Sequence, residues 1–96
     1  MRLSRSERQQ IKAAVAALDA DAKVYLYGSR VDDSLRGGDI DLLVVSDILD
    51  FSDKITLLAD IKSRIGEQKI DLSIKKEAEL EEDAFVRSLL LAAILL

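Results

Sequence analysis

The chain has 96 residues, 49% of them hydrophobic, and a formal net charge of −4. This length allows one domain, residues 1–96, with a modest core, and the negative charge argues against general nucleic-acid binding through a basic surface. The sequence contains no cysteine and no histidine, which excludes disulfides, thiolate metal sites and histidine-dependent catalysis. The charged residues 1–10 predict no signal peptide, and we expect a cytoplasmic protein without a membrane anchor.

The first predicted element is an amphipathic helix over residues 4–18. Ser4 is placed to cap its N-terminus, and Glu7, three residues later, is placed to return a hydrogen bond to the cap. The polar face of this helix is basic, and we interpret it as a solvated face, with a patch that steers an anionic partner as the alternative. The following apolar residues recur at helical spacing and predict the buried face: Leu3, Ile11, Ala14, Val15 and Leu18.

Residues 24–45 carry the clearest chemical pattern in the chain. The run from Val24 to Tyr27 predicts a short strand, and Gly28 and Ser29 predict a turn that opens onto a loop or a half-turn of helix. Glycine lets the backbone approach a ligand closely, and free N–H groups at the start of a helix attract anions. These residues predict a phosphate-binding turn, although a Gly-Ser pair alone is usually only a turn.

Two aspartates stand where the next predicted strand, residues 39–45, begins. Asp39 and Asp41 are two positions apart, so in a strand both point to one face while Ile40 points to the other. Two carboxylates on one face repel each other, and paired hard oxygen ligands beside a phosphate site are what Mg²⁺ binds. The pair therefore predicts a metal site, with a solvent-exposed strand face as the alternative.

A second core helix is predicted over residues 52–65, because apolar residues recur there and Gly66 follows, where a helix C-terminus favours glycine. Residues 69–74 alternate as a third strand. A strand, a helix and a strand of these lengths imply a parallel crossover, which aligns the starts of the second and third strands. Asp71 is therefore expected beside the aspartates of the second strand, with a solvent-facing position as the alternative. The second helix is predicted to bury Ile55, Leu58, Ile61 and Ile65.

An acidic run over residues 77–83 precedes a strongly apolar segment at residues 84–96. Acidic side chains suit a helix N-terminus, and the segment after them is predicted to be a helix that is apolar on nearly every side. One face of this helix can pack on the sheet, whereas the opposite face needs a partner chain or a second copy. A buried, frayed C-terminal helix is the alternative.

Together these motifs resemble the nucleotidyltransferase superfamily of the DNA polymerase β type. The resemblance implies an α/β (α+β) nucleotidyltransferase fold, with a small mixed three-stranded sheet and flanking helices in the order α-β-(short α)-β-α-β-α. The residues that carry the match are Tyr27-Gly28-Ser29, Asp39-Ile40-Asp41 after a spacer, and Asp71 on a later strand.

The same resemblance assigns roles to the motif residues. Asp39, Asp41 and Asp71 would be catalytic and would form a two-metal Mg²⁺ site, with Asp71 favouring deprotonation of the attacking hydroxyl. Gly28 and Ser29 would bind the β- and γ-phosphates of ATP, the substrate.

The residues between the two motifs are less specific. Arg30 directly follows the Gly-Ser pair, as in small members of the superfamily, and is expected to bind the triphosphate. Arg36 is a second flanking cation, and Val31 with Leu35 could pack one helical turn on the core. Many relatives carry serine at the position of Gly38, so one possible capping hydroxyl is missing here.

In its small size the chain resembles the minimal nucleotidyltransferase (MNT) domains encoded beside HEPN-domain proteins. This resemblance implies an antitoxin that binds a HEPN ribonuclease toxin through residues 84–96 and transfers AMP to one of its hydroxyl groups, expected to be that of a tyrosine. Two alternatives remain open. One is a non-catalytic module that binds a nucleotide or a partner and neutralises that partner by contact; the other is a homodimeric small-molecule nucleotidyltransferase of the aminoglycoside-modifying kind.

Overall fold

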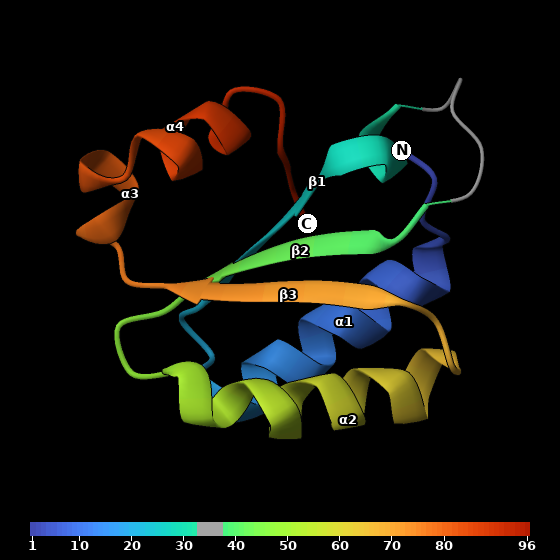
Figure 1. Cartoon of the computed structure of the whole chain (residues 1–96). Coiled ribbons are helices and arrows are strands. Elements are labelled where there is room, and N and C mark those ends of the chain that lie inside the picture. Colours follow the sequence, from blue (N-terminus) through green and yellow to red (C-terminus); the bar gives the residue numbers. More distant parts are fainter. Residues whose placement is uncertain (33–37) are drawn as a thin grey trace.

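The computed structural model of the chain describes residues 1–32 and 38–96 (Figure 1). A four-stranded sheet lies between two long helices on one face and two short helices on the other. This arrangement confirms the predicted α/β fold class. The elements in chain order are α1 (Arg5–Leu18), β1 (Lys23–Tyr27), η1 (Gly28–Val31), β2 (Ile40–Val45), η2 (Phe51–Asp53), α2 (Lys54–Ile65), β3 (Ile70–Lys75), α3 (Glu79–Glu82), α4 (Ala84–Leu90) and β4 (Ile94–Leu95).

The sheet is mixed and has the strand order β3-β2-β1-β4. β2 runs parallel to β3 and antiparallel to β1, and β4 pairs with β1 in the antiparallel direction. The parallel pair is connected through α2, as the predicted crossover requires. The predicted number of three strands is wrong, because Ile94 and Leu95 form a fourth strand at the edge of the sheet.

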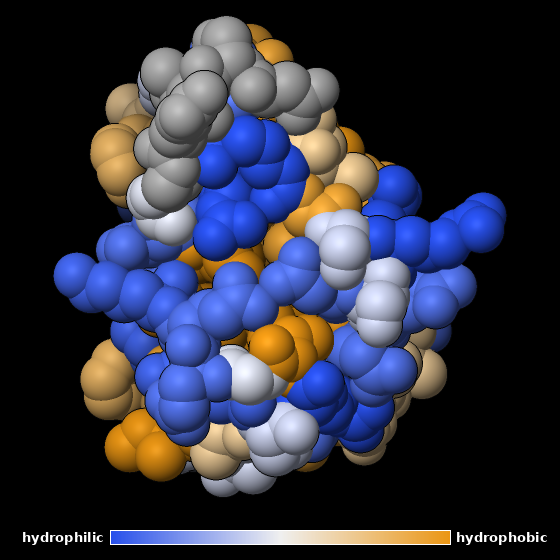
Figure 2. All heavy atoms as spheres, turned by 90° about the vertical axis from the view of Figure 1, so that its right-hand side faces the viewer, coloured by the Kyte–Doolittle hydropathy of each residue, from blue (hydrophilic) through white to orange (hydrophobic). Residues whose placement is uncertain are grey.

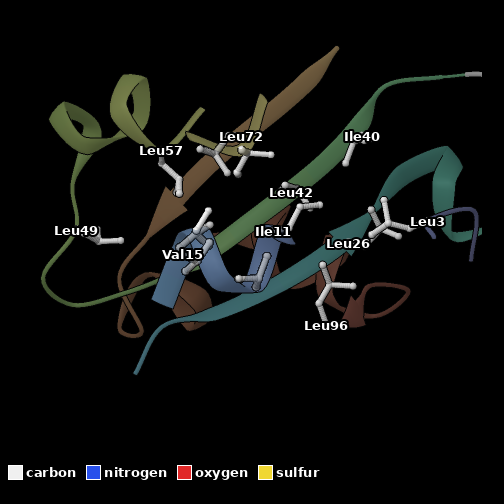
Figure 3. Close-up of a cluster of buried hydrophobic side chains, with 14 residues drawn as sticks. Leu3, Ile11, Val15, Leu26, Ile40, Leu42, Leu49, Leu57, Leu72 and Leu96 are labelled. Atoms are coloured by element: carbon white, nitrogen blue, oxygen red, sulfur yellow. The ribbon is translucent and has the colours of Figure 1, made fainter. Parts of the chain in front are cut away.

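The main core lies between the sheet and the two long helices. Alternate residues of the three longer strands point into this core, so that Leu26, Leu42 and Leu72 are fully buried. The helices contribute side chains from the opposite side, among them Ile11 of α1 and Leu57 of α2 (Figure 3). This layer of apolar contacts fixes the relative positions of the strands, and with them the positions of the motif residues.

The other face of the sheet carries a smaller apolar cluster. Leu43 and Val45 of β2 are buried there against Val86 of α4. β2 is therefore buried on both faces over most of its length, which confirms the prediction from its apolar run. In Figure 1 the short helices α3 and α4 lie toward the C-terminal ends of β2 and β3, so the ends where these strands begin are not covered by them.

α1 begins with the predicted capping box. The Ser4 hydroxyl accepts a hydrogen bond from the Glu7 N–H at 3.0 Å, and Glu7 Oε1 accepts one from the Ser4 N–H at 2.9 Å. Gln68 Nε2 donates a further hydrogen bond to Glu7 Oε2 at 2.7 Å, which ties the start of α1 to the loop after α2. These hydrogen bonds, the one from Gln68 first, hold the pKa of Glu7 below its usual value of 4.5.

Glu7→Gln is expected to lower the free energy of unfolding at pH 7 by less than about 1 kcal/mol, and to have no effect in acid. Because the folded-state pKa of Glu7 is lowered, the stability that its charged form contributes is present above about pH 4.5 and is lost as the pH falls through the folded value. Thermal unfolding of the wild type and the variant at pH 7 and about pH 3 measures this difference. A gap between the two melting temperatures that is the same at both pH values would contradict it.

α2 packs through a different stripe from the predicted one. Leu57 and Ile61 are fully buried, whereas Ile55, predicted to be in the core, is 77% exposed. At 3.6 residues per turn, residue 55 lies about 100° from the centre of the stripe formed by residues 57, 58, 61 and 65. The prediction for Ile55 is therefore wrong, because its spacing from Leu58 alone did not fix the face of the helix.

The prediction of one apolar helix over residues 84–96 is also wrong. α4 ends at Leu90, and the chain turns back to form β4 beside β1. The Leu96 N–H donates a hydrogen bond to the Val24 carbonyl oxygen at 2.9 Å, and the Leu96 side chain is buried in the main core. The free edge of β1 thus satisfies the backbone of the apolar end, and the pairing brings the Leu96 side chain into the core. No helix in the described part of the chain is long and apolar enough to cross a membrane.

Candidate active site

Three side chains form a row across the sheet at the ends where β2 and β3 begin. The strand register pairs Tyr27 of β1 with Asp41 of β2, and Asp41 with Asp71 of β3. Paired residues of neighbouring strands point to the same face, so these three side chains lie on the face opposite the main core. Asp39 lies one residue before β2. The structure thus places Asp71 beside Asp41, as the predicted crossover requires.

The carboxylates of this row influence one another. Burial raises the pKa of Asp41 above its usual value of 3.8, and the negative charges of Asp71 and then Asp39 raise it further. This is how carboxylates behave when they share a site, because each charge disfavours ionisation of the next. Asp41 and Asp39 are half-buried, whereas Asp71 is exposed at the outer strand of the sheet.

The Gly-Ser turn lies directly against Asp41. β1 ends at Tyr27, and η1, a 3₁₀ helix of four residues, starts at Gly28. Gly28 has a φ of +76°, in the left-handed region that favours glycine, and a Cβ atom at this position would overlap Asp41 Oδ2. The predicted phosphate-binding turn and the predicted metal ligand are therefore neighbours, and their close approach depends on the missing side chain of residue 28.

Arg30, predicted to bind the triphosphate, contacts backbone carbonyl groups in this structure. Its Nη1 donates a hydrogen bond to the Arg2 carbonyl oxygen at 2.8 Å, and its Nε donates one to the Gly38 carbonyl oxygen at 3.4 Å. Arg2 Nη2 in turn donates to the Ser29 carbonyl oxygen at 3.0 Å. The two arginines fasten the N-terminal segment to the Gly-Ser turn, a role that no motif around Arg2 indicated. The second flanking cation, Arg36, lies outside the described residues.

Gly38→Ser is expected to lower the free energy of unfolding by about 1–3 kcal/mol, because a residue with a side chain is strained at positive φ. Gly38 has a φ of +86°, and a Cβ atom there would overlap Ser29 Oγ. A serine, which many relatives carry at this position, would therefore not fit here without a shift of Ser29. Urea unfolding measures the change, and an unchanged midpoint would contradict it. Leu35, predicted to pack with Val31, lies outside the described residues.

Tyr27 was not predicted to be a residue of the site, because in the motif it fills the hydrophobic position before Gly28. It is in register with Asp41 and packs against the apolar cluster that contains Leu43. Burial raises the pKa of Tyr27 above its usual value of 10.0, and the charges of Asp71 and Asp41 add to this effect. The alternation of β3 indicated that Ser73 and Asp71 share a face, but only the register of β1 with β2 shows that Tyr27 joins them.

The Gly-Ser turn is also bordered by an open groove of about 500 Å³ between η1 and α4. Figure 2 faces the end of the molecule at which β2 and β3 begin, and its surface there is mostly hydrophilic, with apolar patches between the charged side chains. The residues that line the groove are Tyr27, Gly28, Ser29, Val31, Asp32, Ser88, Leu89 and Ala92.

The donor set of this corner fits divalent cations by its chemistry. Three carboxylates supply the hard oxygen ligands that Mg²⁺ prefers, and two of them are direct neighbours in the register. Within residues 1–32 and 38–96, no group of three acidic, cysteine or histidine side chains is gathered closely enough to hold a metal ion. Mutual repulsion turns neighbouring carboxylates apart, and rotation about their χ angles can bring carboxylates that are in register together on a cation.

A family model described as a nucleotidyltransferase domain matches residues 8–96. The chain belongs to this family. A search of curated proteins found no match to the chain.

Two solved structures resemble this nucleotidyltransferase domain. One, described as a "putative nucleotidyltransferase", is 29% identical with a TM-score of 0.58, over 80% of this chain and 86% of the other. The second, a "putative nucleotidyltransferase" from Sulfolobus solfataricus, is 20% identical with a TM-score of 0.52, over 94% of this chain and 81% of the other. The second likeness supports the fold alone, whereas the family match covers both motifs and the third carboxylate.

Proposed function

We propose that this nucleotidyltransferase domain is an active, Mg²⁺-dependent enzyme that transfers AMP from ATP to a hydroxyl group. The observation that supports this most is a single juxtaposition: Gly28 lies against Asp41, and Asp41 is in register with Asp71. Nucleotidyl transfer needs a phosphate-binding turn next to paired carboxylates, since most of the catalysis is positioning and neutralisation of charge. This corner of the sheet supplies both.

The roles of the residues follow from their places in the site. Asp39, Asp41 and Asp71 would hold Mg²⁺, which supplies Lewis-acid neutralisation of the entering and leaving oxygens. Gly28 and Ser29 bind the β- and γ-phosphates through backbone N–H groups and the serine hydroxyl. The acceptor oxygen attacks the α-phosphorus, the bond to the β-phosphate oxygen breaks, and pyrophosphate leaves. Asp71, the exposed carboxylate, faces the incoming acceptor and takes its proton.

The acceptor that we propose is a tyrosine hydroxyl of a partner HEPN ribonuclease toxin, which would make this protein an antitoxin. Two features support a protein acceptor. The groove of about 500 Å³ beside the Gly-Ser turn is bounded by α4, and on the same C-terminal part of the chain Phe85 is 68% and Leu91 90% exposed. Because residues 94–96 belong to the sheet and core, the docking surface would be α4 and the turn after it, rather than a helix over residues 84–96.

Two alternatives use the same fold. A non-catalytic module would neutralise its partner by contact, and the hydrogen bonds that occupy Arg30 are the observation that favours it. A small-molecule nucleotidyltransferase would complete its acceptor site by forming a homodimer, which the exposed apolar side chains on α4 and after it also permit.

The test is incubation of the protein with α-labelled ATP, Mg²⁺ and a candidate HEPN-domain partner. The double variant Asp39→Asn, Asp41→Asn is the control. We expect label on the partner protein. This label should be absent with the double variant and after addition of a chelator. Co-purification of the two proteins without label would support the non-catalytic module. In a parallel incubation with an aminoglycoside, label on that compound but not on the protein partner would support the small-molecule enzyme.

A further inference from the structure

Among the described residues, β3 is the outer strand of the sheet, with β2 on one side and no strand on the other. The Lys69 carbonyl oxygen accepts a hydrogen bond from the Ile40 N–H at 3.0 Å, and the Lys75 carbonyl oxygen accepts one from the Ser46 N–H at 2.9 Å. The backbone groups of residues 69 and 75 therefore face β2. Because this direction alternates along a strand, those of residues 70, 72 and 74 point outward and form an edge that a further strand can pair with.

A groove of about 170 Å³ lies beside this edge. Four consecutive residues of β3, 72–75, line the groove, so it follows the edge of the strand rather than one of its faces. The other lining residues are Phe51 and Lys54, where the chain enters α2. Phe51 is 79% exposed. A strand added to β3 would cover part of this aromatic surface, so that pairing buries apolar area in addition to forming hydrogen bonds.

The charges of β3 are complementary to those of a second copy that runs in the opposite direction. When Ser73 pairs with Ser73 of the second copy, Asp71 stands directly opposite Lys75, and by symmetry this contact occurs twice. Opposite charges that face each other across an antiparallel pair stabilise it. The same register sets the outward backbone groups of Leu72 opposite those of Ile74, as an antiparallel ladder requires.

The neighbouring registers lack this match. A pairing centred one residue earlier sets Lys69 opposite Lys75, and one centred a residue later brings Asp71 to Glu77. Both bring like charges together, which destabilises a pair of strands. Lysines at the ends of an edge strand usually oppose pairing, but in the register centred on Ser73 each of these two lysines faces an acidic residue.

We propose that a second copy of this chain pairs with β3 in the antiparallel direction, in the register centred on Ser73, and joins the two sheets into one. Directly opposed residues point to the same face, so Lys75 of the second copy lies beside Asp71, on the face that carries the candidate site. Each row of carboxylates then gains a cation at its outer end. Within one chain Lys75 forms a surface ion pair with Glu79, with Nζ and Oε2 4.0 Å apart, and such a pair is weak enough to be exchanged. The inference does not depend on the proposed function, because it uses only the edge, the groove and the charges of β3.

Analytical ultracentrifugation of charge variants over a concentration series tests the contact without any activity. Lys75→Glu sets like charges opposite Asp71, and Asp71→Lys sets like charges opposite Lys75, so each variant alone is expected to raise the Kd of the dimer about tenfold or more. An equal mixture of the two variants restores both opposite pairs and is expected to recover the dimer, which also shows that both variants are folded. Lys12→Glu, the same charge change on α1, is the matched control and should leave the dimer unchanged.

Amide hydrogen exchange tests the register. In the dimer the N–H groups of Leu72 and Ile74 donate across the seam, and we expect them to exchange about tenfold more slowly than in Lys75→Glu, whereas the N–H of Ser73, which faces β2, should exchange alike in both. A wild type that stays monomeric over the concentration series would overturn the proposal and leave this edge to a strand of another protein. A dimer that the β3 variants leave unchanged, or that their mixture does not restore, would place the contact on another surface, such as α4, and would overturn the proposal as well.

Discussion

Replacing Asp41 with asparagine is expected to abolish nucleotide transfer and to leave the fold at least as stable as that of the wild type. The carboxylate is central to the row and contacts the Gly-Ser turn. Loss of a metal ligand removes several kcal/mol of transition-state stabilisation, which corresponds to a fall in kcat/KM of about 1000-fold or more.

The stability of the same variant follows from the direction of the pKa shift. Burial, Asp71 and Asp39 raise the folded-state pKa of Asp41. The stability linked to this group is therefore present below its unfolded pKa and is lost as the pH rises through the folded value. At neutral pH the ionised Asp41 opposes folding, so Asp41→Asn should melt no lower than the wild type, and the gap should close in acid.

Asp60→Asn is the matched control, since Asp60 is an acidic residue of α2, on the other face of the sheet, in a surface ion pair with Arg64. It should keep full transfer activity and a melting temperature that rises with Mg²⁺, as expected for any ligand that binds only the folded state. Asp41→Asn should lose both properties. A large drop in its melting temperature, with transfer retained, would show that Asp41 is structural.

The arrangement of the candidate site residues was the part of the structure that sequence patterns specified best. Asp39 and Asp41 were identified by their two-residue spacing, and Asp71 by the crossover that aligns the starts of two parallel strands. Each of these inferences needs only the period of a strand and the handedness of a connection. The register Asp41 to Asp71 agrees with both.

Long-range pairing was what the sequence could not specify. Residues 84–96 are apolar except for Arg87 and Ser88, so their periodicity favours neither helix nor strand. The outcome depends on the free edge of β1, which the segment meets only in the folded chain. Tyr27 was missed for the same reason, because its place in the row depends on the register between β1 and β2. Arg2 was missed because its partners are carbonyl groups of a distant turn.

Gly28→Ala is the second substitution with a large expected effect, on stability and transfer together. A residue with a side chain at a φ of +76° is strained by about 1–3 kcal/mol, and its Cβ atom would also overlap Asp41 Oδ2. Relief of this overlap requires a shift of the Gly-Ser turn or of the carboxylate. Because a displacement of about 1 Å between catalytic groups can cost 100-fold in rate, we expect a loss of transfer of at least that size.

Gly66→Ala separates the two causes. Gly66 has a φ of +92°, so alanine is strained there as well, but a Cβ atom would meet nothing within 4 Å, and the position caps α2 away from the carboxylate row. Both variants should unfold at lower urea concentration, and activity measured below either transition should be lost only in Gly28→Ala. Equal transfer activity in the two folded variants would mean that the close approach of Gly28 to Asp41 matters for stability but not for transfer. The phosphate-binding role of the turn would then have to be abandoned.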